Sequence, residues 1–240
     1  ADTVSKSAGG TFDADVTFAD GADIITASAG TSNTRVGVNA GNSIASGGNY
    51  NVVIGDEAGT AISTGDNNVA VGFEAGKTIN TASLNTLIGS YSGRLIDTGI
   101  ENVALGYNAL ATDVKGSNSI AIGSKALQAQ SFSGATSANN TAVGHNAGKT
   151  VSTGIDNSIL GAGAGDALTD ADYNTAIGAF ALTTDTLGSK SVAVGSSALF
   201  TQNFTSATDS FNTAVGFNAG ALVTVGLRNT IIGGLTGDAL

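Results

Sequence analysis

The residues that could do chemistry in this 240-residue chain are few and scattered. His145 is the only histidine and there is no cysteine, so a zinc site or a Ser-His-Asp triad lacks its materials beyond that one side chain. The sequence AGKT occurs at 75–78 and 147–150, but Gly72 and Gly76 lie one residue too close for the G-x-x-x-x-G-K loop that binds phosphate. We therefore predict no catalytic, cofactor-binding or metal-binding residue and no cofactor.

An acidic segment, DALTDADYN, runs from Asp166 to Asn174 and offers oxygen atoms of the kind that bind calcium. The Gly-Gly-x-Gly-x-Asp repeat of calcium-binding β-rolls is absent, which favours a solvated acidic loop. Glycoside cleavage needs a pair of carboxylates, and no column of Asp or Glu singles out such a pair. The chain is predicted not to be an enzyme, with a carbohydrate-cleaving fibre kept as the enzyme alternative.

The charge and composition narrow the classes of partner. The net charge is −10 and the nine Lys and Arg residues do not cluster, which disfavours nucleic acid and anionic membranes. No apolar run approaches the roughly twenty residues of a membrane span, so we predict no membrane insertion by this segment. With 35 glycines and only 12% charged residues, the chain is too apolar for a disordered tail and lacks the period of collagen.

An internal repeat explains the composition. The pentad Asn-or-Ser, x, x, aliphatic, Gly occurs twelve times, at intervals of 17 residues, with one interval of 18 and two of 21. We call each unit a coil. Four coils form a block of 72 residues, which is why NTAVGHNAG at 140–148 returns as NTAVGFNAG at 212–220. The pentads end at Gly37, Gly55, Gly72, Gly89, Gly106, Gly123, Gly144, Gly161, Gly178, Gly195, Gly216 and Gly233.

The columns of this alignment predict the fold class. A pentad such as NTAVG is a short strand with a glycine turn, and a 17-residue unit suits one turn of a parallel β-solenoid. We predict an all-β parallel β-roll of about twelve coils, two of them with 21 residues, stacked about 4.8 Å apart. Ten coils begin the pentad with Asn, which we expect to stack as an amide ladder, and Ser119 and Ser191 open the two longer coils.

The strand columns also predict which side chains face the interior. We expect the aliphatic residue before each glycine to pack inside, so that the residue preceding it faces outward. From Val53 on, that outward row carries no charge, and an uncharged ribbon along a rod indicates self-association. A merely alanine-rich, wet sheet is the alternative. The candidate subunit contacts are Ala70, Ala104, Ala121, Ala142, Ala176, Ala193 and Ala214.

The two 21-residue coils contain inserts within 127–140 and 199–212 that are rich in phenylalanine. Loops that project from a rigid scaffold often bind partners, so these rings are candidates for a surface-binding site. The alternative is that they fold under the loop as a satellite core, or lie in the subunit contact. The candidate residues are Phe132, Phe200, Phe204 and Phe211.

The pentads also carry a resemblance to a known family. NSIAIG at 118–123, NTAIG at 174–178 and SVAVG at 191–195 resemble the head repeats of trimeric autotransporter adhesins. The longer pattern that begins ADIITASAG at residue 22 resembles the shafts of tail-fibre-like proteins of marine phages. The resemblance covers about residues 33–240 and implies a left-handed β-roll and a homotrimer. Adhesin heads have a shorter repeat, so the cross-section and subunit packing do not transfer.

These observations together give a prediction of organisation and function. Residues 1–32 are expected to form a lead-in or cap, with strands within Ala14–Gly30, and residues 33–240 the β-roll, which we expect to continue beyond this segment. The predicted function is a structural or adhesive part of an extracellular, cell-surface or virion fibre that presents a region binding a receptor or glycan. An ice-binding solenoid is the second alternative, because Thr34, Thr86 and Thr141 recur in one column.

Overall fold

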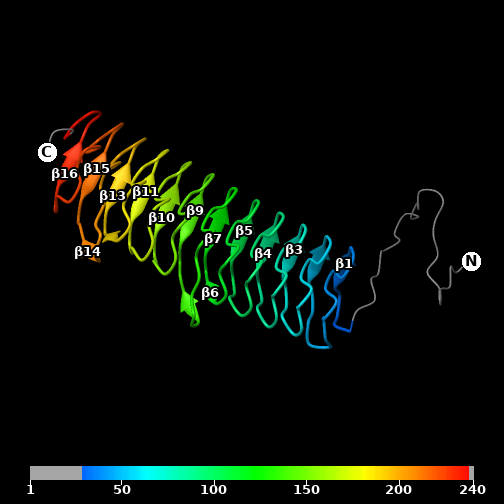
Figure 1. Cartoon of the computed structure of the whole chain (residues 1–240). Helices are drawn as coiled ribbons and strands as arrows, with labels where there is room; N and C mark the ends of the chain where they lie inside the picture. The colour runs from blue at the N-terminus through cyan, green and yellow to red at the C-terminus, as the bar shows by residue number, and fades with distance from the viewer. Residues whose placement is uncertain (1–28, 238–240) are drawn as a thin grey trace, which may run out of the picture.

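The computed structural model describes residues 29–237. The expected N-terminal segment of residues 1–32, with its strands within Ala14–Gly30, lies almost wholly outside the described residues. The described chain is a rod of stacked coils that advances steadily from β1 at one end to β16 at the other (Figure 1). This confirms the predicted all-β parallel solenoid.

One sheet runs the length of the rod. Each of its twelve strands is three residues long, and each pairs in parallel with the strand of the next coil, so that Ala142 lies beside Ile159 and Ile159 beside Ala176. Equivalent columns therefore stack directly on one another, as the repeat predicts. The strands are β1 (Thr34–Val36), β2 (Val52–Ile54), β3 (Val69–Val71), β4 (Thr86–Ile88), β5 (Val103–Leu105), β7 (Ile120–Ile122), β9 (Thr141–Val143), β10 (Ser158–Leu160), β11 (Thr175–Ile177), β13 (Val192–Val194), β15 (Thr213–Val215) and β16 (Thr230–Ile232).

Two further two-stranded sheets mark the longer coils. In the first, β6 (Gly116–Ser117) pairs with β8 (Thr136–Ser137), and in the second, β12 (Gly188–Ser189) pairs with β14 (Thr208–Asp209). Both sheets pair the insert with the preceding coil. The four extra residues of each long coil therefore extend one wall of the rod locally and leave the main sheet in register.

The glycine that ends each strand is required by the stacking. Gly72 has a φ of 134°, and a Cβ atom built on it would lie 2.6 Å from the backbone of Gly89 in the next coil. No other residue tolerates both the backbone conformation and this approach. The marker glycine of the repeat is therefore where the chain leaves the sheet while touching its neighbour.

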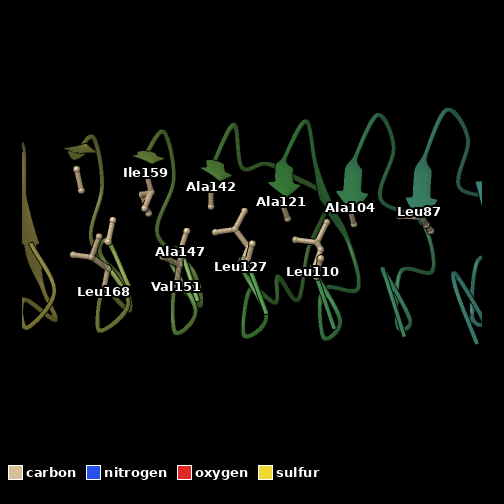
Figure 2. Close-up of a cluster of buried hydrophobic side chains, with 14 of the residues drawn as sticks. Leu87, Ala104, Leu110, Ala121, Leu127, Ala142, Ala147, Val151, Ile159 and Leu168 are labelled. Atoms are coloured by element: carbon tan, nitrogen blue, oxygen red, sulfur yellow. The ribbon is translucent and has the colours of Figure 1, made fainter. Parts of the chain in front are cut away.

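The interior contains the other strand row from the one predicted. Ala70, Ala104, Ala121, Ala142, Ala176, Ala193 and Ala214 are fully buried, whereas the aliphatic residues before each glycine lie on the surface. The alternation along the strand was predicted in the wrong phase. Figure 2 shows the physical reason: the strand side chains meet those of the opposite wall across a narrow interior, where Ala142 and Ala121 face Leu127 and Leu110. Such a thin coil has room for alanine in most of these positions.

The interior volume is balanced between the two walls. Where the strand carries Ala104, the opposite wall supplies Leu110 four residues after the glycine. Where the strand carries Leu87, that position is Gly93, and a Cβ atom there would lie 2.5 Å from a methyl group of Leu87. Large and small side chains thus alternate across the gap, which keeps the packing dense without a cavity.

The asparagine ladder is confirmed, and each amide has a second role. The Oδ1 atom of Asn51 accepts hydrogen bonds from the backbone nitrogen and the Nδ2 atom of Asn68 in the next coil. Its own Nδ2 atom donates to the carbonyl of Gly65, across the same coil, at 2.8 Å. Because these side chains are fully buried, each asparagine joins successive coils and also closes its own coil.

A buried polar network replaces the amide where the ladder is interrupted. Gln130 Nε2 donates to Ser119 Oγ at 2.9 Å and to Asp113 Oδ2 at 2.7 Å, and Gln130 Oε1 accepts from Asn140 Nδ2. Asp113 Oδ1 accepts from the backbone nitrogen of Gly116 at the start of β6. The next block repeats most of this arrangement 72 residues later with Asp185, Ser191, Gln202 and Asn212.

Candidate functional site

The surface feature that runs along the whole rod is the outer face of the main sheet. It consists of two rows, both half-buried or exposed, and none of its side chains is charged. Ile88 is 37% exposed and Leu160 49%. The aliphatic row is Val36, Ile54, Val71, Ile88, Leu105, Ile122, Val143, Leu160, Ile177, Val194, Val215 and Ile232. The threonine-valine row is Thr34, Val52, Val69, Thr86, Val103, Ile120, Thr141, Ser158, Thr175, Val192, Thr213 and Thr230.

Two corners border this outer face. The leading corner is the residue before each ladder amide or serine, and all twelve of its residues have a positive φ. The trailing corner is the residue after each marker glycine. Several large apolar side chains are exposed at both corners, among them Tyr50, Tyr173 and Phe211 at the leading corner and Phe73, Tyr107 and Phe217 at the trailing corner. The corners therefore widen the apolar surface beyond the strands.

The predicted subunit contacts do not lie on this surface. All seven alanines, Ala70, Ala104, Ala121, Ala142, Ala176, Ala193 and Ala214, are inside the coil with no exposed area. They cannot reach a second molecule while the coil is folded. The neighbouring aliphatic row occupies the place that the sequence analysis assigned to them. A signal for this existed in the sequence, because small residues also recur three and four residues after the glycine, on the wall that faces the strand.

The four candidate phenylalanines are divided among three environments. Phe132 and Phe204 are buried, at 7% and 6% exposure, beneath the inserts that carry them, as the satellite-core alternative has it. Phe200 is exposed and follows β13 by six residues. Phe211 is exposed at the leading corner, where the Lys190 ammonium lies 5.4 Å from the centre of its ring. The inserts thus display small polar residues at their tips, such as Ser133 and Ser206.

A group of ion pairs lies beyond the trailing corner in the N-terminal half. Lys77 bonds to Glu57 and Glu74, and Arg94 Nε donates to Glu74 Oε2 at 2.6 Å. Burial alone would raise the pKa of Glu74, but the hydrogen bonds and charges of Lys77 and Arg94 outweigh it and lower this pKa. The bond to Glu57 raises the pKa of Lys77. These charges link three coils and are already paired with one another.

The acidic segment is used for contacts between coils. Asp170 accepts a hydrogen bond from Thr153, and Asp172 Oδ1 accepts one from the backbone nitrogen of Ile155 at 2.8 Å. Burial, together with the charges of Asp170 and Asp156, raises the pKa of Asp172 despite that hydrogen bond. Among residues 29–237 no group of three or more acidic or histidine side chains is arranged to hold a metal ion.

The remaining motif residues are ordinary surface positions. His145 is exposed at the trailing corner, and its backbone carbonyl accepts a hydrogen bond from Gly163. In the first AGKT motif, Thr78 Oγ1 donates to two carbonyls of the next coil, those of Arg94 and Ile96, and Lys77 belongs to the ion pairs. Both motifs therefore have structural partners.

Comparison with known proteins gives no match among family models, curated proteins or solved structures. Within the part of the chain that the structure describes, there is no helix with the length and apolar character of a membrane span. The candidate site of this protein is therefore argued from its own geometry, and that geometry indicates the outer face with its two corners.

Proposed function

We propose that this protein is a structural segment of a fibre, in which copies of the chain associate along the outer face of the main sheet. The observation that carries the proposal is that two rows of uncharged side chains continue through all twelve strands. The homotrimer, the extracellular or virion location and the presentation of a receptor-binding region are supported by the resemblance to adhesin heads and phage fibres.

The size of the face supports association. Twelve strands at about 4.8 Å and a width of about four residues give a surface of roughly 50 Å by 13 Å, or about 650 Å² per copy. Soluble monomers seldom expose an apolar patch larger than a few hundred Å². With the apolar residues of the corners added, the area approaches the roughly 800 Å² per partner of a stable protein complex.

The regularity of the fold supports a mechanical role. Each coil adds about 4.8 Å of length and is tied to its neighbours through parallel strands and buried amides. Such an array can be lengthened by adding coils without changing its cross-section. This suits a shaft that holds a binding region away from a surface.

The experiment compares charges placed on neighbouring residues of the same strands. The double variant Val143→Asp, Ile177→Asp adds charge to the outer face and should dissociate a trimer into folded monomers, as measured by light scattering and circular dichroism. Ala142→Asp places the charge in the interior and should instead unfold the coil. Thr153→Asp, on an exposed polar wall, is the matched control and should leave the trimer intact. A wild-type monomer, or an unchanged mass for the double variant, would refute the proposal.

Ice binding is a second candidate, and one observation favours it. The threonine column that includes Thr86, Thr141 and Thr175 lies on the outer face, half-exposed beside the aliphatic row. The face thus combines hydroxyl and methyl groups in a grid with about 4.8 Å between strands. Ice binding needs this face to be free. A wild-type monomer that shows thermal hysteresis would favour this candidate, and a trimer without thermal hysteresis would exclude it.

A further inference from the structure

We infer that the copies of this chain associate in parallel and in register, so that the leading corner of each coil contacts the trailing corner of the same coil in the next copy. The inference rests on the proposed function and adds to it the register and the contact residues. It follows from how side chains at the two corners match in size and chemistry, level by level along the rod.

The geometry of a cyclic assembly brings these two corners together. If the symmetry axis is parallel to the rods, the strands of every copy run in the same sense around that axis. The end of a strand in one copy then faces the beginning of a strand in the next. The end of each strand is followed by the trailing corner, and the beginning is preceded by the leading corner.

The corner residues of the same coil are matched in size. Leu84 at the leading corner shares its coil with Ser90 at the trailing corner, and Tyr173 shares its coil with Ala179. Both large residues are exposed, at 51% and 52%. At most levels a large side chain at one corner has a small one at the other, so an in-register neighbour would seat each large side chain against a small one. No level has charged residues at both corners.

At two further levels the paired residues can form a hydrogen bond. Tyr50 shares its coil with Asp56, and Tyr107 shares its coil with Glu101, with all four residues exposed. A phenol hydroxyl donates readily to a carboxylate. The tyrosine is at the leading corner in the first pair and at the trailing corner in the second. The pairing therefore does not result from one corner being aromatic throughout.

The one level with two aromatic residues also fits direct contact. Phe211 and Phe217 share a coil and are 48% and 58% exposed. Aromatic rings from two copies gain from an offset or edge-to-face arrangement in addition to their buried area. This level would be a hydrophobic contact near the C-terminal end of the described rod.

A shift of one coil removes this match. If the trailing corner met the leading corner of the following coil, Phe73 would oppose Leu84 and Val38 would oppose Tyr50. With the opposite shift, Phe73 would oppose Tyr50 and Tyr107 would oppose Leu84. Both shifts also separate the two tyrosine-carboxylate pairs. The in-register arrangement is the one that keeps them.

The outer face independently favours parallel copies. In the threonine-valine row, four of the five positions from Val52 to Ile120 are Val or Ile, whereas five of the six from Thr141 to Thr230 are Thr or Ser. Parallel, in-register copies place the aliphatic half against its equivalent and the hydroxyl half against its equivalent. Antiparallel copies would bury hydroxyl groups against aliphatic side chains, which costs hydrogen bonds.

The experiment uses the absence of natural cysteine. Tyr173→Cys with Ala179→Cys places one thiol at each corner of the same coil. Within one chain the two positions are six residues apart across an extended strand, about 20 Å, which is beyond the roughly 7 Å limit for a disulfide. On oxidation this variant should form covalent chains of three copies on a non-reducing gel. The matched control, Tyr173→Cys with His145→Cys, places the thiols two coils apart, about 10 Å along the rod, and should stay as single chains.

The outcomes separate this inference from the proposed function. Covalent trimers from the same-coil pair, with none from the control, would support the register. Equal cross-linking of both variants, or cross-linking of neither while light scattering still shows the assembly, would overturn the register and leave self-association standing. A wild-type monomer by light scattering would overturn both.

Discussion

At the scale of the residue, a single buried amide holds each coil together. Asn157 Nδ2 donates to Asn140 Oδ1 in the coil before it and to the carbonyl of Ala171 at 2.7 Å, and its Oδ1 accepts from the backbone nitrogen of Asn174. The side chain has no exposed area. Its loss would leave a buried backbone donor and a buried carbonyl without partners.

We therefore predict that Asn157→Ala lowers the free energy of unfolding by about 2–4 kcal/mol, because each unsatisfied buried group costs roughly 1–3 kcal/mol. The measurement is the midpoint of chemical or thermal denaturation followed by circular dichroism. Ser158→Ala, the adjacent exposed residue, is the control and should change stability by less than about 0.5 kcal/mol. Equal effects of the two substitutions would contradict the ladder.

Asp172 gives a prediction about pH. Burial and the neighbouring Asp170 and Asp156 raise the pKa of Asp172 in the folded state. As the pH rises above the ordinary carboxyl pKa, the unfolded chain loses its proton first, so the free energy of unfolding falls across this window and stays lower at neutral pH. Asp172→Asn, whose Oδ1 can still accept from Ile155, should raise the unfolding temperature at pH 7 and change it little at pH 3. A lower unfolding temperature at pH 7 would contradict the assignment.

At the scale of the element, the long coils depend on a coordinated exchange of side chains. Where Leu110 and Leu127 replace the usual glycine four residues after the marker glycine, Asp113 and Gln130 replace the usual aliphatic residue three positions later. The leucine fills the interior from one wall, which leaves the other wall free for polar side chains. Gln130 then joins the serine of the interrupted ladder to the insert.

Removal of Gln130 should therefore loosen the insert more than the rest of the coil. We predict that Gln130→Ala lowers the free energy of unfolding by about 2–4 kcal/mol, because buried groups of Asp113, Ser119 and Asn140 lose a partner. It should also speed hydrogen exchange at the Gly116 amide, which is bonded to Asp113. Gln128→Ala, two residues away and half-exposed, is the control. Unchanged exchange at Gly116 would argue against the bridging role.

The columns of the repeat made the elements predictable, but they did not decide which face of the strand is buried. Spacing alone placed the strands, their register and the amide ladder, because like residues must stack in a parallel solenoid. The phase of Ala142 and Val143 could not be read from one strand, since both are apolar. It is set by the opposite wall, where Ala147 leaves too little depth for a second row of large side chains.

The candidate site was predictable to the same extent. The sequence analysis predicted an uncharged surface along the rod and assigned it to the adjacent row of residues. The buried pair Asp113 and Gln130 was missed, because a polar residue in a loop column usually indicates exposure. The simultaneous change of glycine to Leu110 and Leu127 in the same coils was the available signal.

At the scale of the whole molecule, the account rests on one geometric claim: residues one repeat apart lie directly above one another along the rod (Figure 1). From this follow the continuous outer face, the matching corners and the constant cross-section. Because the repeat is the same on every wall, the claim can be tested on the polar wall, away from the proposed interface.

The most direct measurement is disulfide formation between Thr64→Cys and Thr81→Cys, two exposed residues 17 positions apart on the polar wall. Stacked coils place their Cα atoms about 4.8 Å apart, within the range that a disulfide spans. The account predicts nearly complete oxidation to an intramolecular bridge, detected by mass spectrometry of the digested protein. It predicts no bridge for Thr64→Cys with Thr98→Cys, two coils apart. Bridging of the second pair, or its absence in the first, would contradict the stacking of coils in register.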